Sequence, residues 1–208
     1  MKGTAHIAIG ALTGLIIANT LQTEPTTTLL LVGSGGIAGL IPDLDIDGKL
    51  SNKITIPHKL IRTAAPFIGL FMMIYSYLKG IDTEKWLGIG VGIGIIVFSS
   101  FIKKRHMLTI TGAGVLVGGL SLQENWLWLL GVFIILASLV PHRSYTHSIV
   151  GLIFFGVIAY QFEVSLKVEG VFITCLSGYL SHLIADMKLL PFNKRGVRFF
   201  LPFSTKEF

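Results

Sequence analysis

The sequence predicts an all-α integral membrane protein, a polytopic helical bundle of about eight transmembrane or re-entrant helices in a single domain over residues 1–208. Of its 208 residues, 52% are hydrophobic and 13% are charged, and the mean hydropathy is +0.74. Soluble domains carry about 25% charged residues. A soluble chain of this length also lacks the interior volume to bury so much apolar sequence. Composition therefore favours a membrane protein.

Eight apolar stretches predict the helices. They lie at about 4–20, 27–42, 63–79, 86–102, 107–122, 126–140, 148–162 and 169–185. Each is slightly shorter than the roughly 20 residues of an upright spanning helix. The 24 glycines lower helix propensity, so six or seven spans with one re-entrant piece is the alternative. Pairs such as Gly10 and Gly14, and the series Gly88, Gly90, Gly92 and Gly94, favour close helix packing over a phosphate-binding loop.

The distribution of Lys and Arg predicts the orientation. When the loops between the eight stretches are numbered alternately, one set holds 14 of the 17 basic residues and the other holds three. Positive residues are retained on the cytoplasmic side of a membrane. We therefore expect a multi-pass protein with both termini in the cytoplasm and a cytoplasmic loop at about 43–62.

Histidines and several aspartates gather on that same side. All six histidines fall at or near the predicted cytoplasmic face, as do four aspartates: His6, His58, His106, His142, His147, His182, Asp43, Asp45, Asp47 and Asp186. Imidazole nitrogens and carboxylate oxygens are ligands for zinc, manganese and iron. Ionisable groups at membrane level are costly unless they are paired or coordinated. The sequence therefore predicts a divalent-metal site, with zinc favoured and manganese or iron as alternatives.

Local spacing separates these candidates. His182 and Asp186 are four residues apart and share a helix face. His142 and His147 are five apart and converge only if the chain turns, for which Pro141 and an N-cap at Ser144 or Thr146 provide a break. Arg143 suits an anionic group on a substrate, or is an ordinary inside-facing charge.

The run from Asp43 to Gly48 also imitates the start of a calcium-binding EF-hand loop, but Ile54 occupies the position of the bidentate glutamate. Asp43 and Asp45 are therefore interpreted as metal ligands or as carboxylates that support ligands, and Asp47 as a ligand or a turn residue. His58 and His106 stand beside basic residues, as topology alone would place them; a site role is the alternative for both, and more so for His58. His6 is favoured as a ligand.

The order of these motifs resembles the YdjM-like family of bacterial inner-membrane proteins, which are described as LexA-regulated, with a proposed metal-dependent hydrolase activity. The motifs are a histidine in T-x-H-x-x-x-G, then PDLD at 42–45, HRSYTHS at 142–148 and SHLIAD at 181–186. The order is also similar, more loosely, to that of zinc-dependent phospholipase C proteins. By this resemblance the metal ligands are His6, Asp43, Asp45, His142, His147, His182 and Asp186.

The expected function is a membrane-embedded hydrolase that acts at the cytoplasmic face on a phosphoester or a lipid-linked anionic substrate. A bound metal lowers the pKa of its water from 15.7 to about 7. Asp45 or Asp186 would then accept the proton, and Arg143 would bind the anion. A metal-ion or proton transporter and a non-catalytic scaffold of the SOS response with a structural metal are the alternatives. Membrane lipid is the expected partner; nucleic acid is not, because topology explains the +6 charge.

Overall fold

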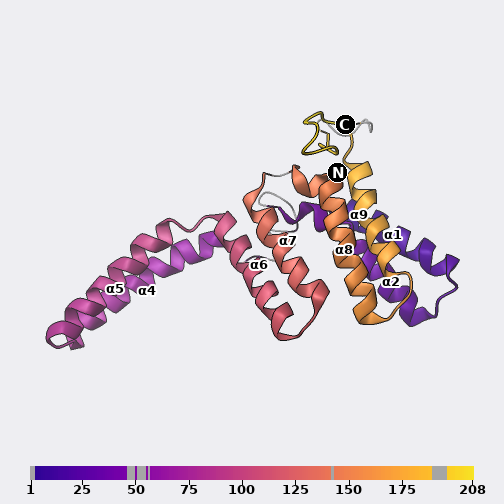
Figure 1. Cartoon of the computed structure of the whole chain (residues 1–208). Helices are drawn as coiled ribbons and strands as arrows, with labels where there is room; N and C mark the ends of the chain where they lie inside the picture. Colours follow the sequence, from indigo (N-terminus) through magenta and orange to yellow (C-terminus); the bar gives the residue numbers. More distant parts are fainter. Residues whose placement is uncertain (1–2, 46–49, 51–54, 56, 142, 189–195) are drawn as a thin grey trace. The chain divides into compact units, whose positions relative to one another are not determined.

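In the computed structural model the regular secondary structure is helical, with no strand among the residues it describes, which are all except 1–2, 46–49, 51–54, 56, 142 and 189–195 (Figure 1). The described residues form eight α-helices: α1 (Gly3–Thr20), α2 (Pro25–Ala38), α4 (His58–Lys79), α5 (Asp82–Ser100), α6 (Lys104–Ser121), α7 (Asn125–Leu139), α8 (Ile149–Leu166) and α9 (Val171–Ala185). Two short 3-10 helices, η1 (Ile41–Leu44) and η2 (Tyr145–His147), complete the described elements. Each predicted apolar stretch corresponds to one helix, so the all-α class is confirmed.

The number of candidate membrane spans is smaller than the number of helices. Among the described residues, Gly3–Thr20, Lys59–Lys79 and Ile149–Leu166 are long and apolar enough to cross a membrane, and α5 with α6 qualifies only as a bent pair. This gives three or four candidate spans, fewer than the eight expected. Helices α7 and α9 have 15 residues each and reach only about 22 Å, against a hydrocarbon core of about 30 Å.

The helix boundaries follow local signals. Helix α7 ends two residues before Pro141, as expected because proline disfavours a helical conformation in the residue that precedes it. Helix α4 begins at His58 and not near residue 63, so His58 lies on a helix and not in the predicted loop. The cap of α8 is Ser148, whose hydroxyl accepts a hydrogen bond from the Gly151 N–H, and not Ser144 or Thr146 as predicted.

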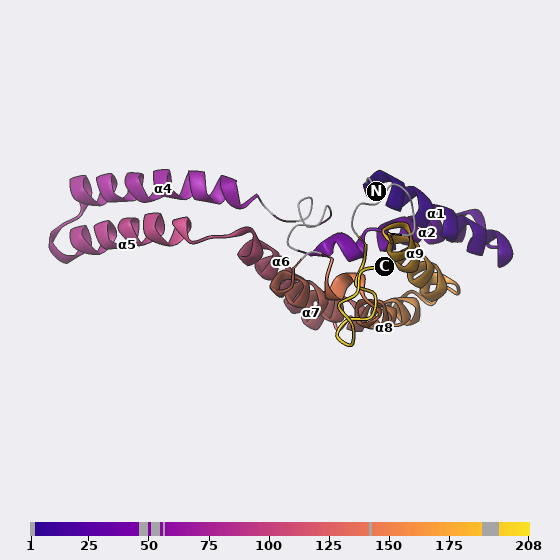
Figure 2. The ribbon, with the colours of Figure 1, turned by 90° about the horizontal axis from the view of Figure 1, so that it is seen from above.

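The chain divides into two compact units, which we describe separately. The hairpin unit, Thr55–Met107, consists chiefly of α4 and α5 packed side by side (Figure 2). Gly88 and Gly92 face α4, where a Cβ would meet Ser76 or Met73, whereas a Cβ at Gly90 or Gly94 would meet no atom within 4 Å. Close packing therefore explains only alternate glycines of this series.

The site unit comprises Met1–Ile54 and Leu108–Phe208. Helix α9 lies at its centre and packs against α1, α2 and α8, while α8 also packs against α7. Within this unit, the N-terminal ends of α1 and α8 and the C-terminal ends of α2 and α9 lie at the same end (Figure 1). This arrangement brings together the segments that carry the predicted histidines and aspartates.

Glycines allow three helices of the site unit to approach closely. The carbonyl oxygen of Gly35 on α2 occupies the place where a Cβ would stand at Gly10 on α1 or at Gly178 on α9. A Cβ at Gly14 would likewise collide with the Leu31 carbonyl. The Gly10–Gly14 pair therefore packs as its spacing predicts.

We expect Gly10→Val to destabilise the protein by about 1–3 kcal/mol, because its side chain must push α1 away from the α2 backbone. The matched control is Gly114→Val on α6, where a Cβ meets no atom within 4 Å. Thermal unfolding of the two variants in detergent, followed by size-exclusion chromatography, measures the difference. Equal midpoints would show that the α1–α2 contact is not tight.

Candidate metal centre

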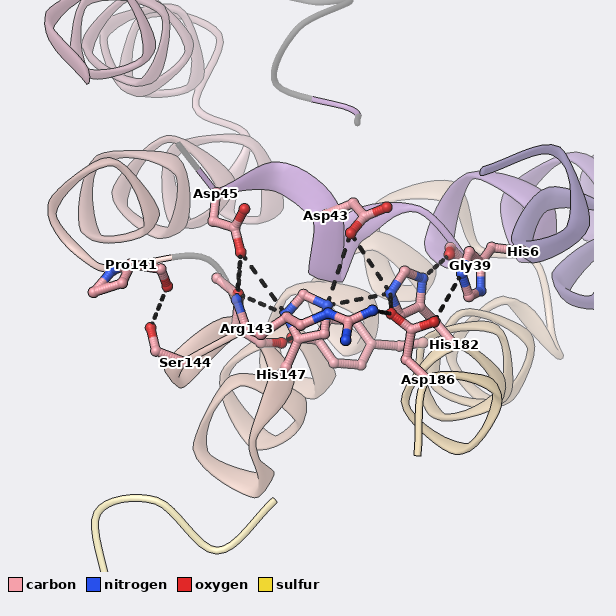
Figure 3. Close-up of polar contacts among 12 residues, drawn as sticks. His6, Gly39, Asp43, Asp45, Pro141, Arg143, Ser144, His147, His182 and Asp186 are labelled. Carbon is pink, nitrogen blue, oxygen red and sulfur yellow. Dashed lines mark hydrogen bonds and ion pairs between the residues drawn. The ribbon is translucent and has the colours of Figure 1, made fainter. Parts of the chain in front are cut away.

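Four segments of the site unit bring seven of the predicted site residues together (Figure 3). They are His6 of α1, Asp43 of η1, Asp45 directly after η1, Arg143 and His147 of the turn that leads into α8, and His182 and Asp186 at the end of α9. Apart from Arg143, no more than 2% of the surface of any of them is exposed. The cluster is therefore a buried set of imidazoles and carboxylates.

Asp43, His147 and His182 form its central group. Asp43 Oδ1 lies 3.8 Å from the Nε2 atoms of both histidines, and these two Nε2 atoms are 3.3 Å apart. The point equidistant from the three atoms is about 2.1 Å from each, and bonds from zinc to nitrogen or oxygen ligands are about 2.0–2.2 Å long. The three side chains thus present one ligand atom each at the spacing that a metal ion requires.

The backbone fixes the tautomer of His182. Its Nδ1 lies 2.7 Å from the carbonyl oxygen of Gly39. A carbonyl oxygen can only accept a hydrogen bond, so Nδ1 carries the proton. The Nε2 atom of the neutral ring therefore has a lone pair directed toward Asp43 and His147, as in a metal-ligating histidine held by an outer hydrogen bond.

Thr146 and Asp45 fix the tautomer of His147. The Thr146 hydroxyl donates its single proton to Asp45 Oδ2 at 3.1 Å, so it can only accept at its 3.1 Å contact with His147 Nδ1. Asp45 Oδ2 also lies 3.8 Å from this Nδ1. His147 Nδ1 therefore carries the proton, and Nε2 again presents a lone pair.

These two assignments leave two imidazole lone pairs facing each other across 3.3 Å. Such an arrangement is repulsive unless a positive charge lies between them. A protonated imidazole or a metal cation can supply that charge, and a cation also satisfies the Asp43 carboxylate. Two histidines and one carboxylate are sufficient ligands for a catalytic zinc with an open position, and they also suit iron.

A second group, His6, His182 and Asp186, adjoins the first and shares His182. The ring of His6 stacks on that of His182 with centroids 3.9 Å apart, and its Nε2 lies 3.3 Å from Asp186 Oδ1. Neither nitrogen of His6 makes a hydrogen bond of good geometry with a described residue. Buried polar groups are usually hydrogen-bonded. The ring of His6 is therefore a candidate to bind a metal ion or another ligand.

Arg143 connects two of the carboxylates. Its Nη2 donates to Asp186 Oδ2 at 2.9 Å, and its backbone N–H donates to Asp45 Oδ2 at 3.3 Å. Burial opposes ionisation of the Asp186 carboxyl, but the neighbouring His6, His182 and Arg143 outweigh it and hold its pKa well below the usual range. Asp186 therefore remains an anion that can accept hydrogen bonds or bind a cation.

The turn that carries Arg143 is conformationally special. Arg143 has φ of 60°, in the left-handed region that residues other than glycine seldom adopt. The Ser144 hydroxyl donates to the Pro141 carbonyl at 2.5 Å, and the Tyr179 hydroxyl of α9 donates to the Thr146 carbonyl. These contacts hold the turn in the shape that directs both Arg143 and His147 into the cluster.

The remaining predicted residues have different outcomes. Asp45 belongs to neither candidate metal-binding group and lies on the Nδ1 side of His147. Of the two predicted roles, metal ligand or carboxylate that supports a ligand, this position fits the second. His106 is exposed, and its Nδ1 accepts a hydrogen bond from the Lys103 backbone N–H. His142, Asp47 and the side chain of His58 lie outside the described part of the chain.

Three residues that support the site were not predicted to do so: Thr146, Tyr179 and Gly39. The sequence indicates Thr146 only as a possible helix cap, although it lies inside the HRSYTHS motif. Tyr179 lies about one turn before His182 on the same helix. Gly39 contributes a backbone carbonyl, for which side-chain chemistry provides no signal. A polar residue directly before a candidate ligand would have identified Thr146, and one three residues before a candidate ligand on the same helix would have identified Tyr179.

We expect His147→Ala and His182→Ala each to abolish stoichiometric metal binding, because each removes one of three central ligand atoms. The control is His106→Ala, which changes an exposed histidine with a local backbone contact and should leave the metal content unchanged. Inductively coupled plasma mass spectrometry of the detergent-purified proteins measures the content. Unchanged stoichiometry in both cluster variants would remove these histidines from the ligand set.

We expect Thr146→Val to weaken metal binding about 10- to 100-fold, because the isosteric change removes the hydroxyl that holds both Asp45 and His147 Nδ1. Thr109→Val is the matched control, since the Thr109 hydroxyl bonds Ser138 within the α6–α7 pair. Competition with a chromogenic zinc chelator measures both affinities. An unaltered affinity in Thr146→Val would show that the orientation of His147 does not depend on this hydroxyl.

Comparison with known proteins supports a membrane protein. No curated protein and no solved structure matches the chain. A family model described as YdjM inner membrane protein matches residues 1–208. Since that match extends over the entire sequence, the chain belongs to the YdjM inner membrane protein family.

Proposed function

We propose that this protein is a metal-dependent hydrolase of the bacterial inner membrane, acting at the cytoplasmic face on a phosphoester or lipid-linked anionic substrate. The observation that carries the proposal is the convergence of Asp43 Oδ1 with two Nε2 lone pairs in a buried site. Zinc is the first candidate for the metal, with manganese and iron as alternatives. When bound, a divalent metal acts as a Lewis acid that polarises a phosphoryl or carbonyl oxygen and makes its own water more acidic.

In this proposal the metal ligands and the residues that position them have different roles. Asp43, His147 and His182 would hold the metal. Asp45 is fully buried and is engaged by the Thr146 hydroxyl and the Arg143 backbone N–H. Asp45 therefore positions His147 and is poorly placed to touch a substrate.

His6 and Asp186 form the pair best suited to accept a proton. The lowered pKa of Asp186 makes its carboxylate a weak base. Asp186 Oδ1 instead lies 3.3 Å from His6 Nε2, which places an imidazole beside a carboxylate at the edge of the central group. We assign general-base character to His6, because an imidazole is the side chain that most often transfers protons in catalysis.

Arg143 is the group through which an anionic substrate would be bound. About a quarter of its side chain is exposed, whereas the Asp186 carboxylate beneath it is 3% exposed. A guanidinium presents planar, paired donors that match phosphate and carboxylate oxygens. Its place between the buried cluster and the exterior suits the entrance of the site.

The test is hydrolysis by the metal-loaded protein in detergent micelles. It is followed as phosphate release from a phosphomonoester, and as release of the alcohol and the phosphomonoester product from a phosphodiester and from a phospholipid. We expect Asp43→Asn to lower kcat/KM at least about 100-fold, because it removes the anionic ligand of the central group. Arg143→Lys should chiefly raise KM, since an ammonium retains the charge but not the paired donors.

His106→Gln is the control and should retain full activity. The proposal fails if the wild type hydrolyses none of the three substrates faster than Asp43→Asn does while binding stoichiometric metal. Metal uptake into sealed vesicles under the same conditions would instead identify a transporter.

A further inference from the structure

An apolar cavity of about 420 Å³ lies in the site unit between α2, α7, α8 and α9. Apart from Ser34, its lining has no strongly polar side chain, and the Ser34 hydroxyl donates to the Leu31 carbonyl of its own helix. Water would find few partners there. An empty apolar void would also forfeit dispersion contacts. The cavity therefore suits a hydrocarbon occupant.

The cavity has a buried floor and an exposed rim. Ala38 and Ala159, on the floor, are each 1% exposed, whereas Ile37, on the rim, is 65% exposed. In a membrane this rim faces the bilayer, so the occupant can enter laterally.

The cavity is continuous with the segment that carries the metal ligands. Ala38 and Ile41 line it, Ile41 begins η1, and Asp43 follows two residues later. Gly39, between the two lining residues, is the residue whose carbonyl holds His182. A chain that extends along the cavity therefore ends beside the candidate metal centre.

A second apolar cavity, of about 340 Å³, lies between α7 and α8 and is lined at one end by Tyr145 and Thr146. Thr146 is the residue that holds His147 and Asp45. The two cavities thus reach the two turns, η1 and η2, that carry Asp43 and His147, two of the three central ligands. Two apolar chains joined to one anionic head would match two cavities that reach one site.

We propose that the first cavity binds an acyl chain of a diacyl phospholipid whose phosphate group is recognised by Arg143, so that the substrate of the site is a membrane phospholipid. This inference rests on the proposed hydrolase function, but it concerns binding and is testable without turnover. The second chain occupies the cavity at Tyr145 and Thr146. Arg143 supplies the positive charge that the phosphate requires.

The test uses metal-free protein in vesicles of phosphatidylethanolamine and phosphatidylglycerol with a tracer phosphatidylglycerol that carries a diazirine on one acyl chain. After irradiation, mass spectrometry compares labelling of the buried floor residues Phe155 and Ala159 with labelling of Ile153, which is 63% exposed. We expect labelling of the floor to saturate and to be displaced by unlabelled phosphatidylglycerol. Labelling of Ile153 should rise linearly with tracer, as for bulk lipid.

Gly33→Leu is the blocking variant, because Gly33 lines the cavity and a Cβ there meets no atom within 4 Å. It should reduce saturable floor labelling at least fivefold without changing Ile153. Gly118→Leu, at an equally open position on α6, should label as the wild type does. Floor labelling that is absent in the wild type, or equal in both variants, would overturn the inference.

Separate experiments test whether binding requires the phosphate head group and whether it requires two acyl chains. A diacylglycerol tracer, which lacks the phosphate, should label the floor several-fold less than the phosphatidylglycerol tracer, and Arg143→Gln should abolish that difference. Preferential labelling by a single-chain isoprenyl phosphate would overturn the assignment to a diacyl lipid. Saturable labelling by a protein that hydrolyses nothing would retain the inference on binding and reject the hydrolase. Hydrolysis without floor labelling would reject the inference on binding and retain the hydrolase.

Discussion

The hydrogen bond between His182 Nδ1 and the Gly39 carbonyl is the contact on which the chemistry of the cluster depends. It forms because α9 approaches α2 closely, with Gly178 lying against the Gly35 carbonyl, where a side chain would separate the helices. The same contact leaves Nε2 as the ligand atom of His182 and directs it toward Asp43 and His147. Small residues in the helix interface thus determine the tautomer of an imidazole, which in turn determines which nitrogen the site can present to a ligand.

The arrangement of charge in the cluster favours a cation. Three carboxylates, those of Asp43, Asp45 and Asp186, lie around the rings of His147 and His182. Buried carboxylates are costly unless they are hydrogen-bonded, paired or coordinated to a metal. A divalent cation between the two Nε2 atoms would bind the Asp43 carboxylate and would also resolve the repulsion between the two facing lone pairs. One proton shared by the histidines would resolve only the repulsion.

Much of the fold and the cluster could be predicted from the sequence, and each failure has a physical cause. Apolar runs located the eight described helices. Helix length depends on where the packed backbone turns, and three or four of the described helices or helix pairs are long enough to span a membrane, so the predicted number of about eight is not confirmed. The side preference of histidine and aspartate identified His6, Asp43, His147, His182 and Asp186. The side preference alone does not separate His106 from His147; the basic neighbours of His106 favour a topological role for it, and the structure places it on the surface. Only tertiary structure distinguishes a histidine that bonds its own backbone from one that faces an aspartate across the bundle.

The sharing of His182 determines how many metal ions the cluster can bind tightly. Its Nδ1 is committed to Gly39, so it offers one nitrogen to two potential groups. If the central group uses that nitrogen, His6 and Asp186 remain as two ligands for any second ion, and Asp186 is already bound to Arg143. Zinc sites in proteins use three or four protein ligands. The geometry therefore favours one strongly bound ion at Asp43, His147 and His182, with His6 and Asp186 beside it as the acid–base pair and not as a second metal site of equal strength.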